Sequence, residues 1–85
     1  MMKIVEVADG EGLKGLMGKR VLLMCSNFFY NGMLTGVNDT CVLLTDASIV
    51  YDTGPWDQNK YNDAQKLPKP VYVQVSAIEA FMEGL

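Results

Sequence analysis

The side chains that could carry catalytic or metal chemistry are few in this sequence and poorly grouped. The chain contains no histidine, the commonest general base and metal ligand. Its two cysteines, Cys25 and Cys41, each stand in an apolar run and lack a neighbouring base that could activate them. The acids Asp39, Asp46 and Asp52 are spread along one segment without an identifiable partner acid. We therefore predict that the protein is not an enzyme and uses no catalytic residue, metal or cofactor.

One glycine-rich segment has the form of a nucleotide-binding motif. Residues 10–15 read GEGLKG, which is a literal G-x-G-x-x-G. A dinucleotide site needs a full crossover helix and a second parallel strand after this motif. Only Leu16 and Met17 stand between the motif and Gly18, where the next element begins. We interpret the match as a coincidence.

The charge balance argues against a broad nucleic-acid-binding face. The chain carries 7 basic and 10 acidic residues, which gives a net charge of −3. Nonspecific contact with phosphates needs an excess of positive charge on one face. Six of the seven basic residues nevertheless fall into two groups, between residues 14 and 20 and between residues 60 and 69. A local basic rim and ordinary solvated charge are both open interpretations of these groups.

Length and composition predict one small domain that associates with copies of itself. The 85 residues suffice for a single domain, and 49% of them are apolar. A domain of this size buries only a limited fraction of its surface, so we expect some of the apolar surface to be covered by other subunits. Two cysteines make no disulfide framework, and no segment has the pattern of a membrane span or a signal peptide. We expect a cytoplasmic protein.

Hydrophobic periodicity and turn residues predict a mostly β domain. The predicted strands are residues 20–25, 28–37, 40–51, 70–76 and 77–82. Leu13, Leu16 and Met17 have helical spacing, which predicts a helix of one or two turns between residues 9 and 18. Residues 3–7 are open to either a strand or a loose arm. Residues 52–69 carry glycine, prolines and many polar residues and are predicted to form a long loop.

The predicted strands differ in which faces we expect to be buried. Residues 20–25 read RVLLMC, an apolar run that suits a strand buried on both faces. Residues 70–76 alternate instead, with Val71, Val73 and Val75 on one face and Tyr72, Gln74 and Ser76 on the other. The strand at 40–51 should also divide its side chains. One face is expected to carry Leu43, Thr45, Ala47, Ile49 and Tyr51, and the other Val42, Leu44 and Val50.

Four segments carry a resemblance to a known family. They read GKRVLLMC at 18–25, YNGMLTGVND at 30–39, VLLTDA at 42–47 and PVYVQVSAIEAF at 70–81. In the second segment Gly32 and Gly36 fall where the family pattern has glycine, and a glycine within a strand suits the sharp bend of a small barrel. Over about residues 13–82 the chain resembles the Sm-like family.

The resemblance implies a definite architecture for one domain spanning residues 1–85. This is a strongly bent, five-stranded antiparallel small barrel of the SH3-like kind, with a short N-terminal helix. Its core covers about residues 13–82, with a variable loop at about 52–69. The resemblance also places a turn at Ser26–Asn27 and none at Asn31–Gly32, although Asn-Gly is the strongest short hairpin signal.

A homo-oligomeric ring is the assembly that the resemblance implies. The fourth strand of one subunit would pair with the fifth strand of its neighbour. An exposed apolar edge such as residues 71–75 has to be covered, and a head-to-tail contact that closes gives a ring. The residues expected at this interface are Val71, Tyr72, Val73, Val75, Ile78, Ala80 and Phe81.

The RNA pocket of the family is not carried over to this chain. In the family, an aromatic residue and an Asn of one pore loop contact a base, and an Arg comes from a second loop. Here Thr40 and Val42 replace the first two, and residues 74–77 contain no Arg. The remaining candidates for RNA contact are Asn38, Asp39, Thr40, Gln74 and Ser76. Their polar groups are equally suited to forming turns.

The variable loop offers a second candidate surface, formed by Trp56, Lys60 and Tyr61. Aromatic side chains beside a cation can stack on bases or anchor a protein partner. The alternative is that Trp56 only pins the loop onto its own domain.

The sequence leaves two possible functions open. The first is an Sm-like ring that binds RNA, or acts as an RNA chaperone, through a non-standard site. The alternative is a structural or protein-recruiting ring without RNA binding. The expected partners are further copies of the chain, single-stranded RNA and other proteins, but no membrane.

Overall fold

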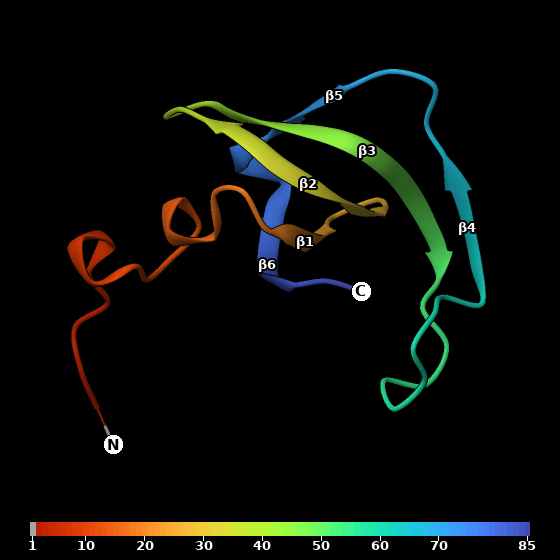
Figure 1. Cartoon of the computed structure of the whole chain (residues 1–85), viewed down its shortest axis with the longest axis horizontal. Coiled ribbons are helices and arrows are strands. Elements are labelled where there is room, and N and C mark those ends of the chain that lie inside the picture. The colour runs from red at the N-terminus through yellow and green to blue at the C-terminus, as the bar shows by residue number, and fades with distance from the viewer. Residues whose placement is uncertain (1) are drawn as a thin grey trace.

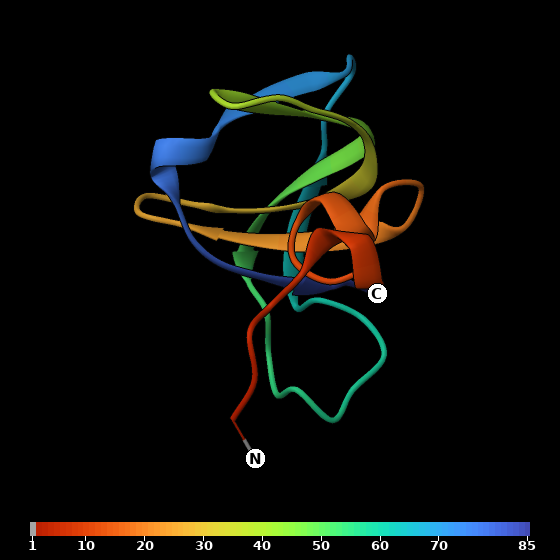
Figure 2. The same ribbon diagram turned by 90° about the vertical axis from the view of Figure 1, so that its left-hand side faces the viewer.

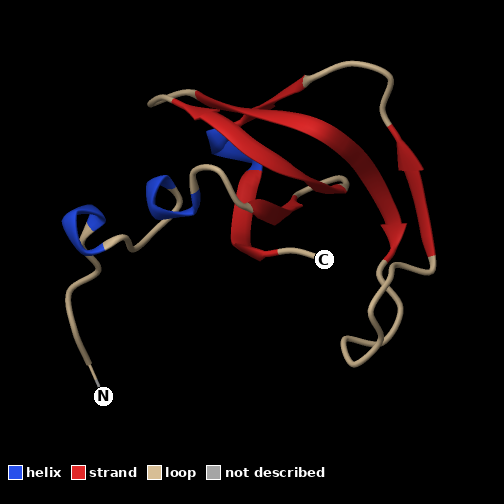
Figure 3. Cartoon of the chain, in the orientation of Figure 1, coloured by secondary structure: helices blue, strands red, loops and turns tan. Residues whose placement is uncertain are grey.

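The structure is a computed structural model, and it describes residues 2–85. It contains six β-strands and three single turns of 3₁₀ helix (Figures 1 and 3). The strands are β1 (Arg20–Cys25), β2 (Phe29–Val37), β3 (Cys41–Asp52), β4 (Asp63–Lys66), β5 (Val71–Gln74) and β6 (Ile78–Glu83). The 3₁₀ turns are Val7–Asp9, Lys14–Leu16 and Val75–Ala77. The prediction of a mostly β domain is confirmed. No helix in residues 2–85 has the length and apolar character needed to cross a membrane.

All strands belong to one antiparallel sheet with the order β4-β3-β2-β1-β6. The long strand β3 also pairs with β5, which lies against residues 41–44, whereas β4 lies against residues 48–52. Figure 2 shows the sheet wrapping round, with the edge strand β5 at the top of the view and the edge strand β6 at the bottom. These two strands do not pair with each other, so the sheet stays open. The predicted barrel is therefore not seen in the single chain.

The main core lies on the inner face of this bent sheet. Alternate residues of β1 point into it, and Leu34 of β2 and Val73 of β5 complete it from the other side. Its buried members are Val21, Leu23, Cys25, Leu34, Val42, Leu44, Ala47 and Val73. Leu13 and Leu16, beside the second 3₁₀ turn, pack against its margin. The predicted alternation of residues 71–74 is confirmed, because Val73 is buried while Tyr72 and Gln74 are exposed.

Strand β1 is buried on both faces, as its unbroken apolar run predicts. Leu22 is fully buried but does not belong to the main core, because successive side chains point to opposite faces of a strand. It pairs with Asn31 on β2 and with Met82 on β6. The sheet thus has a second apolar face, and residues 53–61 lie over part of it.

A bulge in β3 overturns the predicted faces of that strand. Asn31 pairs with Ser48 and Met33 with Thr45, so β3 holds one residue more than β2 in this interval. Asp46 has φ 48° there, in the left-handed region. The extra residue changes the phase of the alternation. Ala47 is consequently buried in the main core, on the face predicted for Val42 and Leu44 and not on the opposite one.

Several predicted boundaries also change in the structure. The turn at residues 26–27 is confirmed, since β2 runs unbroken through Asn31 and Gly32. The predicted loop 52–69 contains β4, and the strand predicted for 70–76 ends at Gln74. The predicted helix at 9–18 is replaced by turns of 3₁₀ helix.

Glycines explain why the predicted helix at residues 9–18 does not form. Gly10, Gly12 and Gly18 all have positive φ values, which a continuous right-handed helix does not allow. Residues 3–6 form no strand and are exposed, so the loose arm is the alternative that the structure bears out.

Candidate functional site

The two segments predicted to contact RNA lie side by side at one end of the sheet. Cys41 pairs with Gln74, and the Val75 backbone N–H donates to the Thr40 carbonyl over 2.9 Å. Thr40, Gln74 and Ser76 expose their side chains there, as does Asp39. The structure therefore brings together residues that are 34 or more positions apart in the sequence, as the resemblance implies.

Asn38 is committed to the turn between β2 and β3. Its side-chain oxygen accepts hydrogen bonds from the backbone N–H groups of Thr40 and Cys41, both at 2.8 Å. The Thr40 hydroxyl donates to the same oxygen over 3.1 Å. Such Asx bonds are the usual chemistry of a tight turn. Neither Asn38 nor the neighbouring Asp39 supplies positive charge, and residues 38–41 and 74–77 contain no lysine or arginine to hold a phosphate.

Tyr61 anchors the loop 53–61, and Trp56 does not. The Asn31 side-chain amide donates a hydrogen bond to the Tyr61 hydroxyl over 3.0 Å. Trp56 leaves 62% of its surface exposed. This exposure argues against the interpretation in which Trp56 pins the loop, and it leaves an aromatic side chain of high binding potential accessible.

Gln58 stabilises the loop from within. Its side-chain amide nitrogen donates to the Lys60 carbonyl and to the Asn62 side-chain oxygen, both over 2.8 Å. At the start of the loop, the Gly54 N–H donates to the Asp52 carboxylate over 2.9 Å. Lys60 is exposed, and its backbone is fixed by Gln58. The loop thus has a defined shape.

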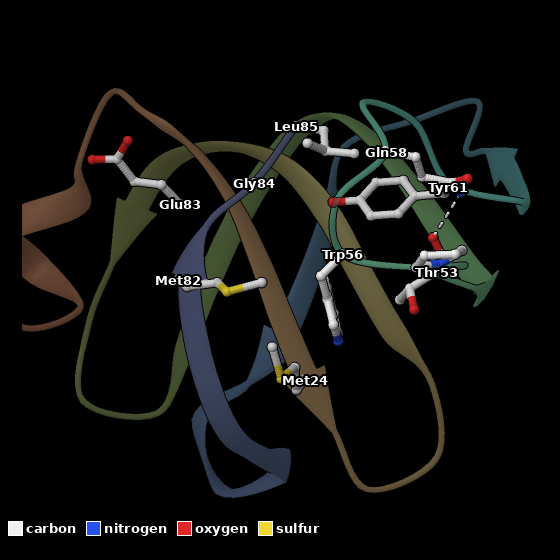
Figure 4. A pocket seen from close by; sticks show the side chains of 10 residues that line it. Met24, Thr53, Trp56, Gln58, Tyr61, Met82, Glu83, Gly84 and Leu85 are labelled. Carbon is white, nitrogen blue, oxygen red and sulfur yellow. Dashed lines mark hydrogen bonds between the residues drawn. The ribbon is translucent and has the colours of Figure 1, made fainter.

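A cavity of about 610 Å³ lies between this loop and the second face of the sheet (Figure 4). Met24 of β1 and residues 82–85 form the sheet side, and residues 53–61 form the loop side. Figure 4 shows Trp56 and Met82 extending towards the space above Met24. A volume of this size and an aromatic and thioether lining are typical of sites for apolar ligands or side chains.

A polar network ties the loop to four strands. Arg20 of β1 donates to the Asn31 side-chain oxygen over 2.8 Å and to the Asp46 carboxylate over 2.7 Å. Lys66 of β4 lies 2.7 Å from the other Asp46 oxygen. Asn31 is only 5% exposed, and its hydrogen bond to the Tyr61 hydroxyl connects the network to the loop. None of these roles was predicted, and a polar Asn within a mostly apolar predicted strand is the one signal that could have indicated them.

The network lowers the pKa of Asp46. The hydrogen bond from Lys66 is the largest cause, followed by that from Arg20. A carboxyl whose pKa is depressed by folding contributes stability above its unfolded pKa, and this contribution is lost as the pH falls through the lowered value. The carboxylate is exposed to water, which screens its charge, so the contribution to stability is small.

The predicted interface residues divide into two groups. Tyr72, Ala80 and Phe81 expose their side chains at the ends of the sheet, with Tyr72 66% and Phe81 39% exposed. The remaining four face the main core: Val71, Val73, Val75 and Ile78. A groove of about 210 Å³ runs beside β5, between that strand and the β1–β2 turn. Tyr72 lines this groove.

Comparison with known proteins does not identify the chain. A scan against models of known protein families found no match, and neither did a search of curated proteins.

Proposed function

We propose that this chain has an Sm-like fold and forms a homo-oligomeric ring in the cytoplasm, where it serves as a structural or protein-recruiting scaffold. The observation that carries the proposal is the open edge of β5 together with the open edge of β6. In residues 2–85, β5 pairs only with β3 and β6 pairs only with β1. The short strand β4 also pairs only with β3, but it reads DAQK and carries no large apolar side chain. The resemblance of residues 13–82 to the Sm-like family adds to this observation.

Open edges of this kind call for a partner. Each presents unpaired backbone N–H and C=O groups, which natural proteins cover or protect. Strand β6 reads IEAFME, and all of its residues after Ile78 are exposed although Ala80, Phe81 and Met82 are apolar. A strand with this composition is stable in water when a second strand covers it.

The two edges differ from each other, which determines the symmetry. A contact between β5 of one subunit and β6 of the next is head-to-tail, and repeating it around an axis closes a ring. The groove beside β5 adds shape complementarity, because an apolar side chain such as Phe81 from the neighbour can enter it. Pairing of backbones along the edge would supply affinity, and the groove would supply specificity.

Substituting Tyr72→Asp or Phe81→Asp is expected to break the assembly. Both side chains are exposed in the single chain, so the new carboxylate is solvated in the free subunit and becomes unfavourable only when an interface buries it. We expect sedimentation velocity to show a multiple of the 9.4 kDa chain mass for the wild type and single chains for both variants.

The matched control is Tyr51→Asp, which changes a tyrosine that is also about half exposed but lies at the far end of β3. This variant should keep the wild-type mass. The ring proposal is refuted if Tyr72→Asp and Phe81→Asp also keep it, or if the wild type is a single chain at micromolar concentrations.

RNA binding is the second candidate function. The observation that favours it is the meeting of the two predicted segments, with Thr40 and Val75 joined by a backbone hydrogen bond. In a ring, symmetry would repeat the exposed polar groups of Thr40, Gln74 and Ser76 once in each subunit. Hydrogen bonds to the edges of unstacked bases are a usual mode of recognising single-stranded RNA.

RNA binding by these two segments should depend little on salt, because residues 38–41 and 74–77 contain no lysine or arginine to displace counterions. We expect a labelled U-rich or A-rich oligonucleotide to bind with similar affinity at two salt concentrations in fluorescence anisotropy. Combining Gln74→Ala with Ser76→Ala should abolish that binding, while Trp56→Ala should not.

Other outcomes separate the candidates. Binding that weakens steeply with salt would place RNA near the later lysines of the chain and not at this end. If neither oligonucleotide binds at low salt, RNA is excluded as a partner and the scaffold remains.

A further inference from the structure

Two exposed aromatic side chains form a corner at the end of the sheet where β2 begins and β3 ends. The pairing of Phe29 with Val50 brings the flanking residues of these strands together. The rings of Phe28 and Tyr51 meet edge to face there, with centroids 6.0 Å apart and planes at 90°. Phe28 is 44% and Tyr51 52% exposed, so part of each ring face in the corner is open to solvent.

A cavity of about 390 Å³ lies at this corner. Its lining consists of Asn27, Phe28, Phe29, Val50, Tyr51, Asp52 and Thr53. Among these residues Asp52 alone carries a charged side chain. The face of an aromatic ring has a negative potential, so aromatic walls beside one carboxylate attract a positively charged group. The composition of the lining therefore matches a cationic ligand.

The negative charge of Asp52 has no counter-ion in the described part of the chain. None of the ion pairs within residues 2–85 includes its carboxylate. Its cross-strand neighbour on β4 is a second exposed acid, Asp63, which is also absent from those ion pairs. Like charges opposite each other on adjacent strands are destabilising. A cation bound at the corner would reduce this repulsion.

The hydrogen bonds of Asp52 indicate which kind of cation fits. One carboxylate oxygen accepts from the Gly54 backbone N–H over 2.9 Å, and the other accepts from the Asn62 side-chain amide over 3.4 Å. Both donors are neutral, so the carboxylate keeps its charge, but each oxygen already has a partner. An ammonium or guanidinium group that leaves water needs new acceptors for its N–H groups. A quaternary ammonium has no N–H group, and its methyl groups pack against ring faces.

We propose that the corner formed by Phe28 and Tyr51 binds the trimethylated lysine side chain of a protein partner. Both rings are about half exposed, so a free small cation would remain largely hydrated there. A side chain carried by a larger partner is instead held at the corner by the partner's other contacts, which raise its effective concentration. The inference rests on the proposed protein-recruiting function for the choice of a protein as carrier, and it gives that function a class of partner.

Proton NMR of a short glycine-flanked peptide with one trimethyllysine follows this binding on the ligand itself. Aromatic rings shift protons above their faces upfield, so the methyl signal should move upfield in a saturable way as the protein is added. The same peptide with unmodified lysine should bind about fivefold more weakly. A neutral isostere, with a tert-butyl group in place of the trimethylammonium, should also bind about fivefold more weakly, because it lacks the charge that the rings and Asp52 attract.

Variants of the protein test the roles of the ring and the carboxylate. Tyr51→Leu keeps an apolar side chain but removes a ring face, and it should weaken binding of the trimethyllysine peptide by about tenfold, whereas Tyr51→Phe should bind nearly as the wild type does. Asp52→Asn should weaken binding by about threefold and reduce its dependence on salt. The matched control Trp56→Leu changes an exposed aromatic residue outside this lining and should leave the affinity unchanged.

The proposal is overturned if the methyl signal does not move, if the neutral isostere binds the wild type as tightly as the trimethyllysine peptide, or if Tyr51→Leu leaves the affinity unchanged. Tyr51 is the residue to change because Phe28 also lines the groove beside β5, whereas Tyr51 does not. Sedimentation separates the two proposals. A ring that does not bind the peptide refutes this inference alone, and a single chain that binds it refutes the ring alone.

Discussion

Asn31→Leu should lower the free energy of unfolding by about 2 kcal/mol, which corresponds to roughly 10 °C in the melting temperature of a domain this small. Asn31 is buried and links the Arg20 guanidinium to the Tyr61 hydroxyl. Leucine has a similar size but cannot form either hydrogen bond, so two polar groups lose a partner inside the protein. Urea unfolding followed by circular dichroism measures the change.

Two control variants distinguish the network from general effects of the substitution. Asn59→Leu makes the same chemical change at an exposed loop position and should alter stability by less than about 0.5 kcal/mol. Asp46→Asn removes the ion pairs of the network but leaves Asn31 in place, and its effect should also be small because the carboxylate is exposed. Equal losses at residues 31 and 59 would contradict this account.

The second large effect is expected from Gly32→Val, which should destabilise the protein by about 2 to 3 kcal/mol. A Cβ atom at residue 32 would lie only 3.1 Å from the Cβ atoms of Leu44 and Ala47 and 3.2 Å from the Ala47 Cα. Both neighbours are fully buried, and one of these contacts is with the backbone of the β3 bulge. Valine therefore has to displace the main core or the bulge itself.

Gly36→Val provides the matched comparison within the same strand. A Cβ atom there would meet the Leu43 side chain alone, at 3.2 Å from its Cβ, and Leu43 is only partly buried. Because Gly36 has one such neighbour, outside the main core, and Gly32 has two, both fully buried, we expect Gly36→Val to cost clearly less than Gly32→Val. If urea unfolding shows similar losses of unfolding free energy for the two variants, the core around the bulge adjusts to the added atoms more easily than the close contacts indicate.

The parts of the fold that could be predicted are those set by local periodicity. The predicted strand at 20–25 coincides with β1, and β2 starts one residue later than predicted. The bulge in β3 could not be predicted, because Asp46 is not the glycine that a positive φ normally indicates. Strand β4 reads DAQK and has no β pattern. It forms a strand because it pairs with the edge of β3, and this pairing is a contact between residues distant in the sequence.

The candidate sites show the same division between local and long-range causes. The turn chemistry of Asn38 was foreseen, since an Asx turn depends on its immediate neighbours. The cavity depends on Met24, the end of β6 and the loop 53–61 coming together, and no sequence pattern joins these three segments. The same applies to the contact of Asn31 with Tyr61, which lie 30 positions apart.

The second apolar face of the sheet has a practical consequence for engineering. Surface loops are ordinarily the safest positions for an epitope tag or an inserted domain. Here residues 53–61 act as a cover over β1, held by Gln58 from within and by Tyr61 at the end. An insertion between these two residues would detach the cover and uncover more of Met24 and of the already exposed Met82, so a labelled protein would tend to aggregate. The turn at residues 26–27 is exposed and bears no such cover, but it lines the groove beside β5, so an insertion there would act on the proposed ring contact.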